Sequence, residues 1–387
     1  MPADRDLVAA ALPHYEIGGE IGRGGWGVVL HGRHTALDRE VAIKQLPPAI
    51  ASGDSALERF VNEARIIGQL DHPHITKVYD FVEHDGLWLM VMEYLSGGTL
   101  WKRFTEEGLR ADQACAISMA VCAGLDAANQ QGVLHRDIKP ENILFTEGGV
   151  PRLGDFGIAK DLDLDTRRTR IGEVVGTPTY MSPEQAVGDE LTRACDVYSV
   201  AVVLYEMLAG RLPFEEARTP TQQLIQHATE TPIPLSETAP EVPEAIADVV
   251  LQALEKRPED RISTPQQLGV ALARAAGETY GPGWLQPCGV ALMGGGPIQA
   301  EAHRGPTMRS SAVAPTFVRP VVRADHFRPD DEAASAGRVS DGAAATIGPS
   351  VDTPTPEQIA VAPSTPSTPP PRETSAAAAT PSSPPGR

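Results

Sequence analysis

Eight consecutive residues place three kinds of phosphate-handling group within one short segment. The run His135-Arg136-Asp137-Ile138-Lys139-Pro140-Glu141-Asn142 holds a carboxylate that can accept a proton, an ammonium group and a metal-binding amide. Thirteen residues after Asn142, the run Asp155-Phe156-Gly157 supplies a second carboxylate that can bind a metal ion. Phosphoryl transfer needs a base, a cation and ligands for Mg²⁺ close together, because the protein positions the reactants and neutralises charge on the transferred group.

A glycine-rich turn upstream is a candidate phosphate-binding element. Gly22, Gly24 and Gly27 have the spacing G-x-G-x-x-G, and glycines let the backbone approach phosphates closely. A dinucleotide-binding fold uses the same spacing, but there the glycines open a helix. Here the β-branched residues Val28 and Val29 follow, which favours a strand–turn–strand. A plain hairpin turn is the alternative if the segment is taken alone.

Val41-Ala42-Ile43-Lys44 puts a lysine on the next predicted strand, within reach of the α- and β-phosphates of a nucleotide. A lysine in such a place loses hydration unless it is paired with an acid. Glu63 is the expected partner, because it shares a face of a predicted helix with Ile67, which would pack inward. Taken alone, Glu63 could be an ordinary solvated carboxylate, but the motifs on either side favour the ion pair.

The elements that must position these groups fall into two regions. Residues 14–94 are predicted to form short strands and one helix, and the pattern turns helical from about residue 110. The predicted strands are 14–21, 27–34, 39–46, 76–82 and 87–94, and the predicted helices are 55–70, 111–131, 194–209, 243–254 and 264–276. Helix 194–209 is apolar on most faces, which predicts a central position.

Composition changes near the C-terminus. Roughly half of the 35 prolines lie after Thr279, among Ala, Ser, Thr and Gly. Such a segment has too few apolar residues to offset the entropy of ordering, so we expect residues 277–387 to be disordered. Its run Pro363-x-x-Pro366-x-x-Pro369 has the three-residue period of polyproline II and is either a solvated spacer or a docking segment for a partner.

Charge excludes one class of partner. The formal net charge is −18, and residues 281–387 hold 8 Lys or Arg and 9 Asp or Glu, so the first 280 residues carry almost all of it. Nonspecific nucleic-acid binding depends on neutralising phosphates, so we expect no nucleic-acid partner. Arginine supplies most of the positive charge, as in high-GC bacterial genomes. Lysines at 44 and 139 stand out, because a compact ammonium group suits a phosphate.

Cysteine usage and the N-terminus bear on the compartment. The 4 cysteines are not arranged as Cys-x-x-Cys and lack zinc-site spacing, which fits free thiols in a reducing cytoplasm. The apolar stretch at 7–12 is too short and its flank too acidic for a secretory signal, and no run approaches the ~18 apolar residues of a membrane span. A soluble cytoplasmic protein is predicted, with membrane attachment only if the chain is part of a longer product.

Together these motifs resemble the protein kinase family, and most closely the bacterial serine/threonine kinases of the eukaryotic (Hanks) type. Further residues that carry the resemblance are Ser182-Pro183-Glu184, Asp196, and Arg261, which looks like the partner of Glu184. The resemblance covers about residues 14–276. It implies an α+β two-lobed fold, with a β-rich N-lobe at 14–94 and an α-helical C-lobe at 95–276, between an N-terminal extension (1–13) and the tail.

The resemblance also implies ATP and Mg²⁺, or Mn²⁺, as cofactors, and a role for each motif residue. Asp137 orients or accepts the proton of the substrate hydroxyl, Lys139 stabilises the γ-phosphoryl charge, and Lys44, fixed by Glu63, orients the α- and β-phosphates. Asn142 and Asp155 hold the metal. The nucleotide contacts implied are Ile21, Gly22, Gly24, Gly27, Val29, Ala42, Lys44, the gatekeeper Met92, the hinge residues Glu93 and Leu95, and Leu144.

Acceptor class and regulation follow from the same resemblance. Lys139 after the catalytic aspartate, and Gly176-Thr177 before the Ser182 motif, are typical of serine/threonine kinases. Thr169 has the placement of an activating threonine and Thr166 is the next candidate. Arg136 is a cation with which a phosphothreonine could pair. Activation by autophosphorylation is therefore expected; the alternative is a mobile polar loop whose threonines have no such role.

Three other functions are weighed against this one. A pseudokinase scaffold would normally have lost a catalytic Lys, Asp or Asn, and all are present. A small-molecule phosphotransferase of related fold usually lacks the glycine-rich pattern and the Ser182-Pro183-Glu184 segment. An adaptor role of the tail could only be added to catalysis. The expected partners are protein substrates with Ser or Thr acceptors, with a homodimer through the N-lobe and docking by the tail as further expectations.

Overall fold

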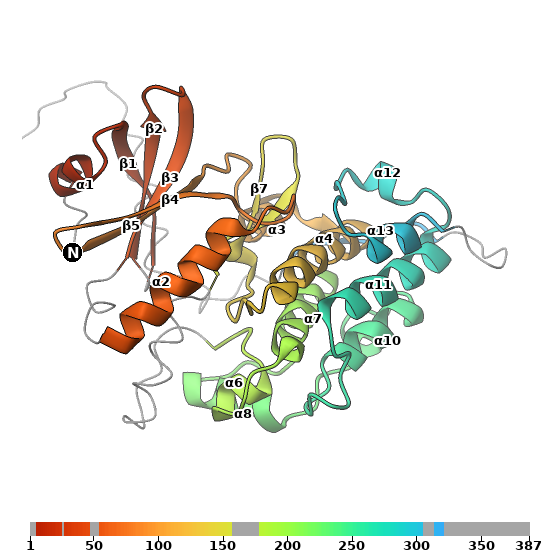
Figure 1. The fold of residues 1–387 in the computed structure, drawn as a ribbon. Coiled ribbons are helices and arrows are strands. Elements are labelled where there is room, and N and C mark those ends of the chain that lie inside the picture. Colours follow the sequence, from red (N-terminus) through yellow and green to blue (C-terminus); the bar gives the residue numbers. More distant parts are fainter. Residues whose placement is uncertain (1–4, 25–26, 47–53, 157–177, 305–312, 321–387) are drawn as a thin grey trace, which may run out of the picture. The chain divides into compact units, whose positions relative to one another are not determined.

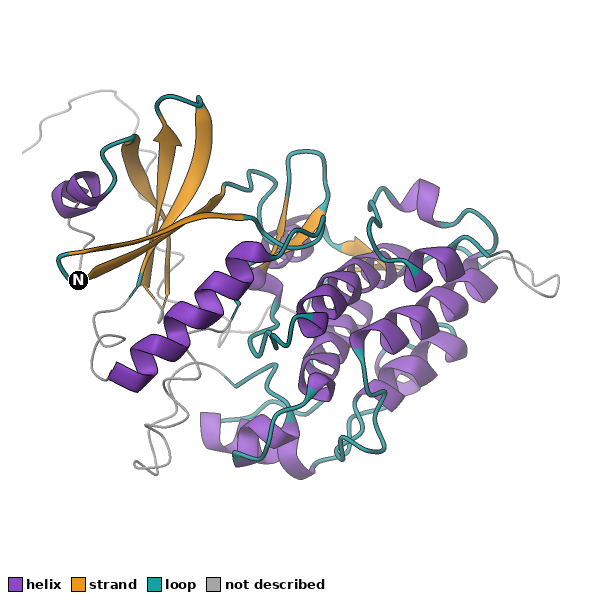
Figure 2. Ribbon diagram, in the orientation of Figure 1, coloured by secondary structure: helices purple, strands orange, loops and turns teal. Residues whose placement is uncertain are grey.

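Two kinds of secondary structure follow one another along the chain. The computed structural model describes residues 5–24, 27–46, 54–156, 178–304 and 313–320, with the backbone alone for 54–60. Strands dominate up to residue 93 and helices dominate after it (Figure 2). This is the α+β division predicted from the sequence, and it is confirmed.

The strand-rich lobe is one antiparallel sheet with a helix on each face. Helix α1 (Arg5–Ala11) packs on one face and helix α2 (Asp54–Gln69) on the other, where Figure 1 shows it beside the sheet. The strand order is β1 (Tyr15–Gly24), β2 (Gly27–His34), β3 (Arg39–Gln45), β5 (Leu87–Glu93) and β4 (Val78–His84).

Alternation along β3 decides which residues meet each helix. Val41 and Ile43 are fully buried in the cluster that includes α1, whereas Ala42 lies in the cluster with Ile67 of α2. Successive side chains of a strand point to opposite faces of the sheet. Lys44 therefore shares the α2 face with Ala42, and both residues are predicted nucleotide contacts.

The helical lobe is built around α4 (Ala111–Gln130) and α7 (Arg193–Ala209), two helices that are buried almost all round, as their apolar sequences predict. Helix α7 begins after Thr192, whose side chain accepts from Ala194 N–H, and it ends at Gly210, which is left-handed with φ 69°. The helical lobe contains, in chain order, α3 (Leu100–Glu107), β6 (Leu109–Arg110), α4 (Ala111–Gln130), the 3₁₀ turn η2 (Pro140–Asn142), β7 (Ile143–Phe145), β8 (Pro151–Leu153), α6 (Pro183–Val187), α7 (Arg193–Ala209), α8 (Pro220–Thr229), α9 (Leu235–Thr238), α10 (Glu244–Ala253) and α11 (Pro265–Tyr280).

The packed region extends further than the sequence predicted. Disorder was expected from residue 277, but α11 runs to Tyr280 and is followed by α12 (Leu285–Cys288), α13 (Pro297–Ala302) and β9 (Phe317–Val318). Trp284 and Ile298 belong to the main core cluster. The prediction failed because average composition does not reveal a few well-placed apolar residues. Residues 321–387, including the polyproline-like run, lie outside the described residues, so their disorder remains a prediction.

We expect Ile298→Ala to destabilise the protein by roughly 2–5 kcal/mol, the usual range for truncating a fully buried isoleucine. Ile298 is 1% exposed, and its side chain fills the space over Gly269 of α11. Ile225→Ala is the matched control, because Ile225 is 54% exposed. Equilibrium unfolding in urea measures both, and equal small effects would show that residues beyond 280 add little to the fold.

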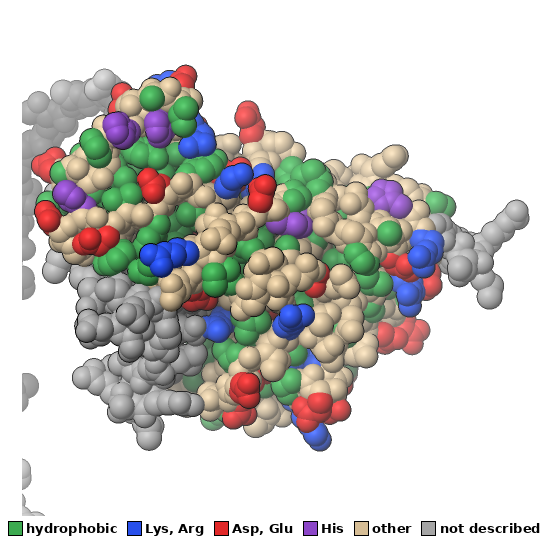
Figure 3. Space-filling model, in the orientation of Figure 1, with side chains coloured by type: hydrophobic (Ala, Val, Ile, Leu, Met, Phe, Trp, Pro, Cys, Tyr) green, Lys and Arg blue, Asp and Glu red, His purple; other side chains and the backbone are tan. Residues whose placement is uncertain are grey.

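Two further sequence expectations can be compared with the described residues. All four cysteines are buried free thiols. Within the described ranges, no helix combines the length and the apolar character that crossing a bilayer requires. On the face shown in Figure 3, acidic and basic side chains are interspersed.

Candidate active site

Two side chains of the predicted catalytic loop, those of Lys139 and Asn142, converge on Asp137. Lys139 Nζ lies 3.1 Å from Asp137 Oδ2, and Asn142 Nδ2 donates to the same oxygen at 3.0 Å and to the Asp137 carbonyl at 2.7 Å. The turn η2 brings Asn142 back toward Asp137, with Pro140 in its first turn. The structure thus brings a carboxylate, an ammonium group and an amide together, as the spacing predicted.

A buried carboxylate from another element holds this loop. Asp196, at the start of α7 and 0% exposed, accepts the backbone N–H groups of His135 at 2.9 Å and Arg136 at 2.8 Å. Arg136 has φ 61°, a backbone conformation that non-glycine residues rarely adopt and that needs such support. The sequence placed Asp196 at the helix start but did not reveal this role, because its partners lie about 60 residues away.

His135 connects the catalytic loop to the strand that leads to Asp155. Its Nδ1 accepts from Asp137 N–H at 3.3 Å, so Nε2 carries the proton and donates to the Gly154 carbonyl at 3.0 Å. Burial lowers the pKa of His135, which favours this neutral ring. The ring also packs against Phe156, with centroids 4.5 Å apart. The two predicted motifs are therefore one structural unit.

The Lys44 ammonium group pairs with Asp155 rather than with a residue of α2. Its Nζ lies 2.8 Å from Asp155 Oδ1, with the lysine side chain 12% exposed. The sequence motifs predicted a Lys44–Glu63 ion pair, and the described residues show none. Burial raises the pKa of Glu63, and the positive charge of Arg136 opposes that rise. In this structure the Lys44 ammonium group pairs with the Asp155 carboxylate, and the predicted pairing with Glu63 is not made.

The residues predicted to enclose adenine lie near Lys44. Ala42 and Met92 are cross-strand partners of β3 and β5, and Val29 pairs with Lys44 across β2 and β3. All three apolar side chains belong to the cluster on the α2 face. Leu144, on β7, abuts Gly154, where a Cβ would come within 2.6 Å of its Cδ1.

The remaining predicted nucleotide contacts frame this cluster. Leu95 is buried, and the Glu93 carboxylate lies 3.4 Å from Arg152 Nη1. Ile21 is 46% exposed on β1. Gly27 has φ 121°, and a Cβ there would come within 1.9 Å of the Gln45 carbonyl oxygen, so no other residue fits. Gly22 pairs with Val29 and Gly24 pairs with Gly27. Gly157, Thr166 and Thr169 lie outside the described residues.

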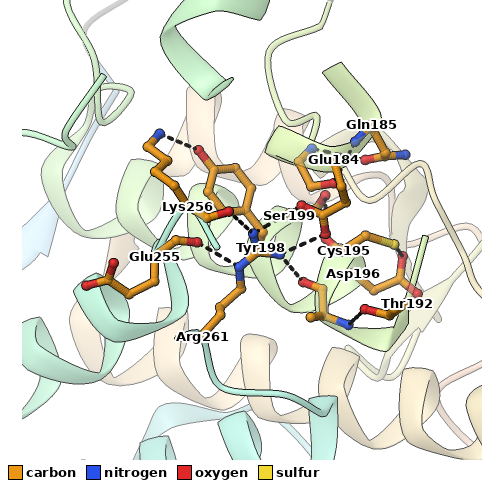
Figure 4. A network of polar contacts seen from close by, with 12 residues as sticks. Glu184, Gln185, Thr192, Cys195, Asp196, Tyr198, Ser199, Glu255, Lys256 and Arg261 are labelled. Carbon is orange, nitrogen blue, oxygen red and sulfur yellow. Dashed lines mark hydrogen bonds and ion pairs between the residues drawn. The ribbon is translucent and has the colours of Figure 1, made fainter. Parts of the chain in front are cut away.

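The Ser182-Pro183-Glu184 motif is anchored by a buried ion pair (Figure 4). Arg261 donates from Nη1 and Nη2 to the two Glu184 oxygens at 2.9 and 3.1 Å, and the two side chains are 0% and 4% exposed. The remaining donors of Arg261 reach the carbonyls of Ala194, Glu255 and Lys256. The pairing of Arg261 with Glu184 expected from the sequence is confirmed.

One contact of this motif was not predicted. Ser182 and Gln185 form a reciprocal capping box at the start of α6. The Gln185 amide also donates to the Arg136 carbonyl at 2.9 Å. The glutamine therefore joins α6 directly to the catalytic loop.

The comparison with known proteins decides the family. The family description "Protein kinase domain" matches residues 15–271, which is more than half of the chain. The chain belongs to the protein kinase family. Its Lys44, Asp137, Asn142 and Asp155 stand in the motifs that this family uses for phosphoryl transfer.

The kinase relatives are bacterial. The chain is 36% identical over 285 residues to "Serine/threonine-protein kinase pkn2" of Myxococcus xanthus, 38% over 265 to "Serine/threonine-protein kinase PknB" of Mycobacterium leprae and 37% over 255 to "Serine/threonine-protein kinase PrkC" of Bacillus subtilis. These alignments cover 71%, 67% and 66% of this chain. They cover 34%, 42% and 39% of those relatives, so the chain spans less than half of their length.

A solved structure agrees with the kinase fold. The Mycobacterium tuberculosis PknI kinase domain has a TM-score of 0.55 and 28% sequence identity to this chain. The match covers 68% of this chain and 96% of that kinase domain.

Proposed function

We propose that this chain transfers the γ-phosphoryl group of ATP to serine or threonine hydroxyls of proteins. The convergence of Lys139 and Asn142 on the Asp137 carboxylate carries the proposal. In the proposed mechanism the Asp137 carboxylate accepts the hydrogen bond of the attacking hydroxyl. Lys139, 3.1 Å away, places positive charge where negative charge develops on the transferred group. Kinship with kinases named for serine/threonine specificity supports the acceptor class.

The donor atoms at this site suit Mg²⁺. Because the Asn142 amide nitrogen is engaged with Asp137, the amide oxygen is the atom left to face a cation. The Asp155 carboxylate is 41% exposed and supplies the second set of hard oxygens. Among the described residues no group of three or more His, Cys, Asp or Glu could hold a metal ion. When bound, the metal neutralises charge on the phosphates.

The remaining predicted site residues are proposed to bind the nucleotide. In the proposed active arrangement Lys44 pairs with Glu63 and orients the α- and β-phosphates, while Val29, Ala42 and Leu144 sandwich the base and Met92 is the gatekeeper. In the structure the Lys44 ammonium group lies 2.8 Å from Asp155 Oδ1. This assignment rests on the family motifs and on the shared face of the sheet.

We expect phosphotransfer to vanish in EDTA and to return with Mg²⁺ or Mn²⁺. The reason is that Asn142 and Asp155 offer only oxygen ligands, which hard cations prefer. Zn²⁺ should not substitute productively. Incorporation of label from [γ-³²P]ATP into a generic protein acceptor measures this. Undiminished transfer in a chelated, metal-free sample would contradict the metal assignment.

The same assay separates the alternatives. A pseudokinase would bind nucleotide, seen as a nucleotide-dependent shift of melting temperature, without labelling the acceptor. A small-molecule phosphotransferase would consume ATP without labelling protein. An adaptor acting only through its tail would show neither nucleotide binding nor transfer.

Regulation by autophosphorylation is part of the proposal, although the threonines lie outside the described residues. A phosphate on Thr169 would pair with Arg136, whose backbone is fixed by Asp196 and Gln185. Charge-assisted hydrogen bonds of ~1.5–3 kcal/mol each would order the loop. Thr166 is the second candidate site.

We expect Thr169→Ala to lower activity by roughly one to two decades, since 1.4 kcal/mol is about tenfold. Thr229→Ala, a threonine near the exposed end of α8, is the control and should match wild type. Mass spectrometry before and after phosphatase treatment, combined with the transfer assay, tests this. Fully active protein without phosphate on Thr169 would place the switch elsewhere.

Partners and compartment stay predictions. Protein substrates are proposed from the family, and the N-lobe homodimer and the docking role of the tail rest on resemblance and composition alone. A cytoplasmic location is proposed from the cysteine usage.

A further inference from the structure

The residues after α11 do more than cover the C-lobe. We define the C-terminal brace as residues 281–304 and 313–320. It begins at Gly281 after α11, and two of its contacts with the rest of the protein concern elements near the site. The first is the loop between α2 and β4, and the second is β6. Neither contact was predicted, because the segment was expected to be disordered.

At the first place a single imidazole joins three elements. His74, 1% exposed in the loop between α2 and β4, accepts from Met293 N–H at Nε2 (2.9 Å), so its Nδ1 carries the proton and donates to the Pro151 carbonyl at 2.8 Å. Burial lowers the pKa of His74 to about 4, which keeps the ring neutral near pH 7. The brace is thereby hydrogen-bonded through one side chain to β8.

A second histidine strengthens this contact. His72 Nδ1 accepts from His74 N–H at 3.2 Å, so its Nε2 donates to the Gly294 carbonyl of the brace at 3.4 Å. Gly294 has φ 63°, and a Cβ there would come within 2.8 Å of His72 Nε2 and 2.9 Å of Pro73 Cγ. Only glycine lets the brace approach the loop this closely.

The backbone around His74 leads directly to the metal-binding carboxylate. Leu153 N–H donates to the His74 carbonyl at 2.9 Å, and Thr76 N–H donates to the Leu153 carbonyl at 2.8 Å. Leu153 ends β8 and stands two residues before Asp155. Gly124 of α4 allows the approach, because a Cβ there would come within 2.8 Å of the His74 carbonyl. The α2–β4 loop therefore holds β8 directly, and the brace holds β8 through His74.

At the second place the brace adds a strand. β9 pairs antiparallel with β6, and Ala111 N–H donates to the Thr316 carbonyl at 2.8 Å. A Cβ on Gly210 would come within 2.6 Å of the Arg319 carbonyl, so the end of α7 also accommodates this strand. The brace is thus anchored on α4 and α7, the two central helices, as well as on the α2–β4 loop.

We propose that the C-terminal brace is part of the catalytic unit and that His74 is a positioning residue, through which the brace holds β8 and hence Asp155. The proposal rests on the proposed phosphotransfer function only for its kinetic consequence. His74 touches neither substrate nor metal in this account; it acts through Pro151 and Leu153. Asp155 misplaced by a loosened β8 would bind Mg²⁺ less well in the transition state.

A pair of glycine variants of the full chain tests the contact with the brace. Gly294→Ala places a methyl group against His72 and Pro73, whereas Gly289→Ala has a similar φ (71°) and open space around the added Cβ. We expect hydrogen–deuterium exchange at the Leu153 and Thr76 amides to quicken ~10-fold or more in Gly294→Ala and to stay unchanged in Gly289→Ala. Equal exchange in the two variants would overturn the proposal.

Two variants of His74 distinguish its hydrogen bond with Met293 from its hydrogen bond with Pro151. His74→Asn can keep the donor to the Pro151 carbonyl but cannot reach Met293 N–H, and His74→Gln can keep the acceptor for Met293 but not the donor. If the brace holds β8 through His74, both variants should lower kcat ~10-fold and raise the half-saturating Mg²⁺ concentration, with the KM for protein acceptor unchanged. Wild-type kcat and Mg²⁺ dependence in His74→Asn would show that the brace does not act through this residue.

The two readouts also separate this proposal from the proposed function. A lowered melting temperature with wild-type kcat well below the melt would mean that the brace is merely structural, and it would overturn the positioning role. If the wild-type protein transfers no phosphate, the proposed function fails, whereas the exchange rates at Leu153 and Thr76 still decide whether the brace holds β8.

Discussion

Replacing Asp137 by asparagine is expected to lower phosphotransfer by ~10²-fold or more, the usual size of a general-base contribution. Asparagine keeps the shape of the side chain but removes the carboxylate on which Lys139 and Asn142 converge at 3.1 and 3.0 Å. Lys44→Met should lower transfer by a similar factor, because it removes the charge proposed to orient the phosphates. Initial rates with purified protein and radiolabelled ATP measure both.

Nucleotide binding distinguishes a chemical defect from a folding defect. Asp137→Asn should still show a nucleotide-dependent rise in melting temperature, since Asp137 is proposed to contact the acceptor rather than the nucleotide. Asp189→Asn is the matched control, because Asp189 is an exposed carboxylate just after α6. Near wild-type turnover of Asp137→Asn would remove Asp137 from the mechanism.

Replacing Arg261 by methionine should cost about 3–5 kcal/mol of unfolding free energy, the range for breaking a buried ion pair. The cost arises because Glu184, 4% exposed, would keep a buried charge without its bidentate partner. Three backbone carbonyls would also lose the guanidinium donors that now reach them. Urea unfolding monitored by circular dichroism measures the change.

A control four residues away isolates the effect of burial. Arg257 also makes an ion pair, with Glu259, but its side chain is 71% exposed. Exposed pairs contribute little because water and salt screen them, so Arg257→Met should unfold with the wild-type midpoint. The double variant Glu184→Gln with Arg261→Met should recover part of the loss. Equal midpoints for Arg261→Met and Arg257→Met would contradict the assigned role of the buried pair.

Contiguous motifs were the most predictable part of the site. Asp137, Lys139 and Asn142 lie within six residues, so local geometry alone brings them together. The sheet faces were also predictable, because alternation along β3 places Ala42 and Lys44 on one side. Both predictions depend only on the spacing of residues along the chain and on the alternation of side chains along a strand.

Long-range contacts were harder to predict. Spacing cannot decide whether Lys44 pairs with Glu63 or with Asp155, because each acid lies on another element of the fold and only the packing of these elements sets the distances. The roles of Asp196 and His74 depend on partners about 60 to 220 residues away. The brace was missed because disorder was judged on average composition, whereas its docking depends on single residues such as Ile298 that fit gaps left by glycines.

The central claim is that this site passes the γ-phosphoryl group of ATP to serine or threonine side chains. Phosphoamino-acid analysis of a protein acceptor, after incubation with Mg²⁺ and [γ-³²P]ATP, tests it most directly. The account predicts labelled phosphoserine or phosphothreonine with the wild-type protein and at least ~10²-fold less with Asp137→Asn. Label found only in phosphotyrosine or in small molecules, or equal labelling by the two proteins, would contradict it.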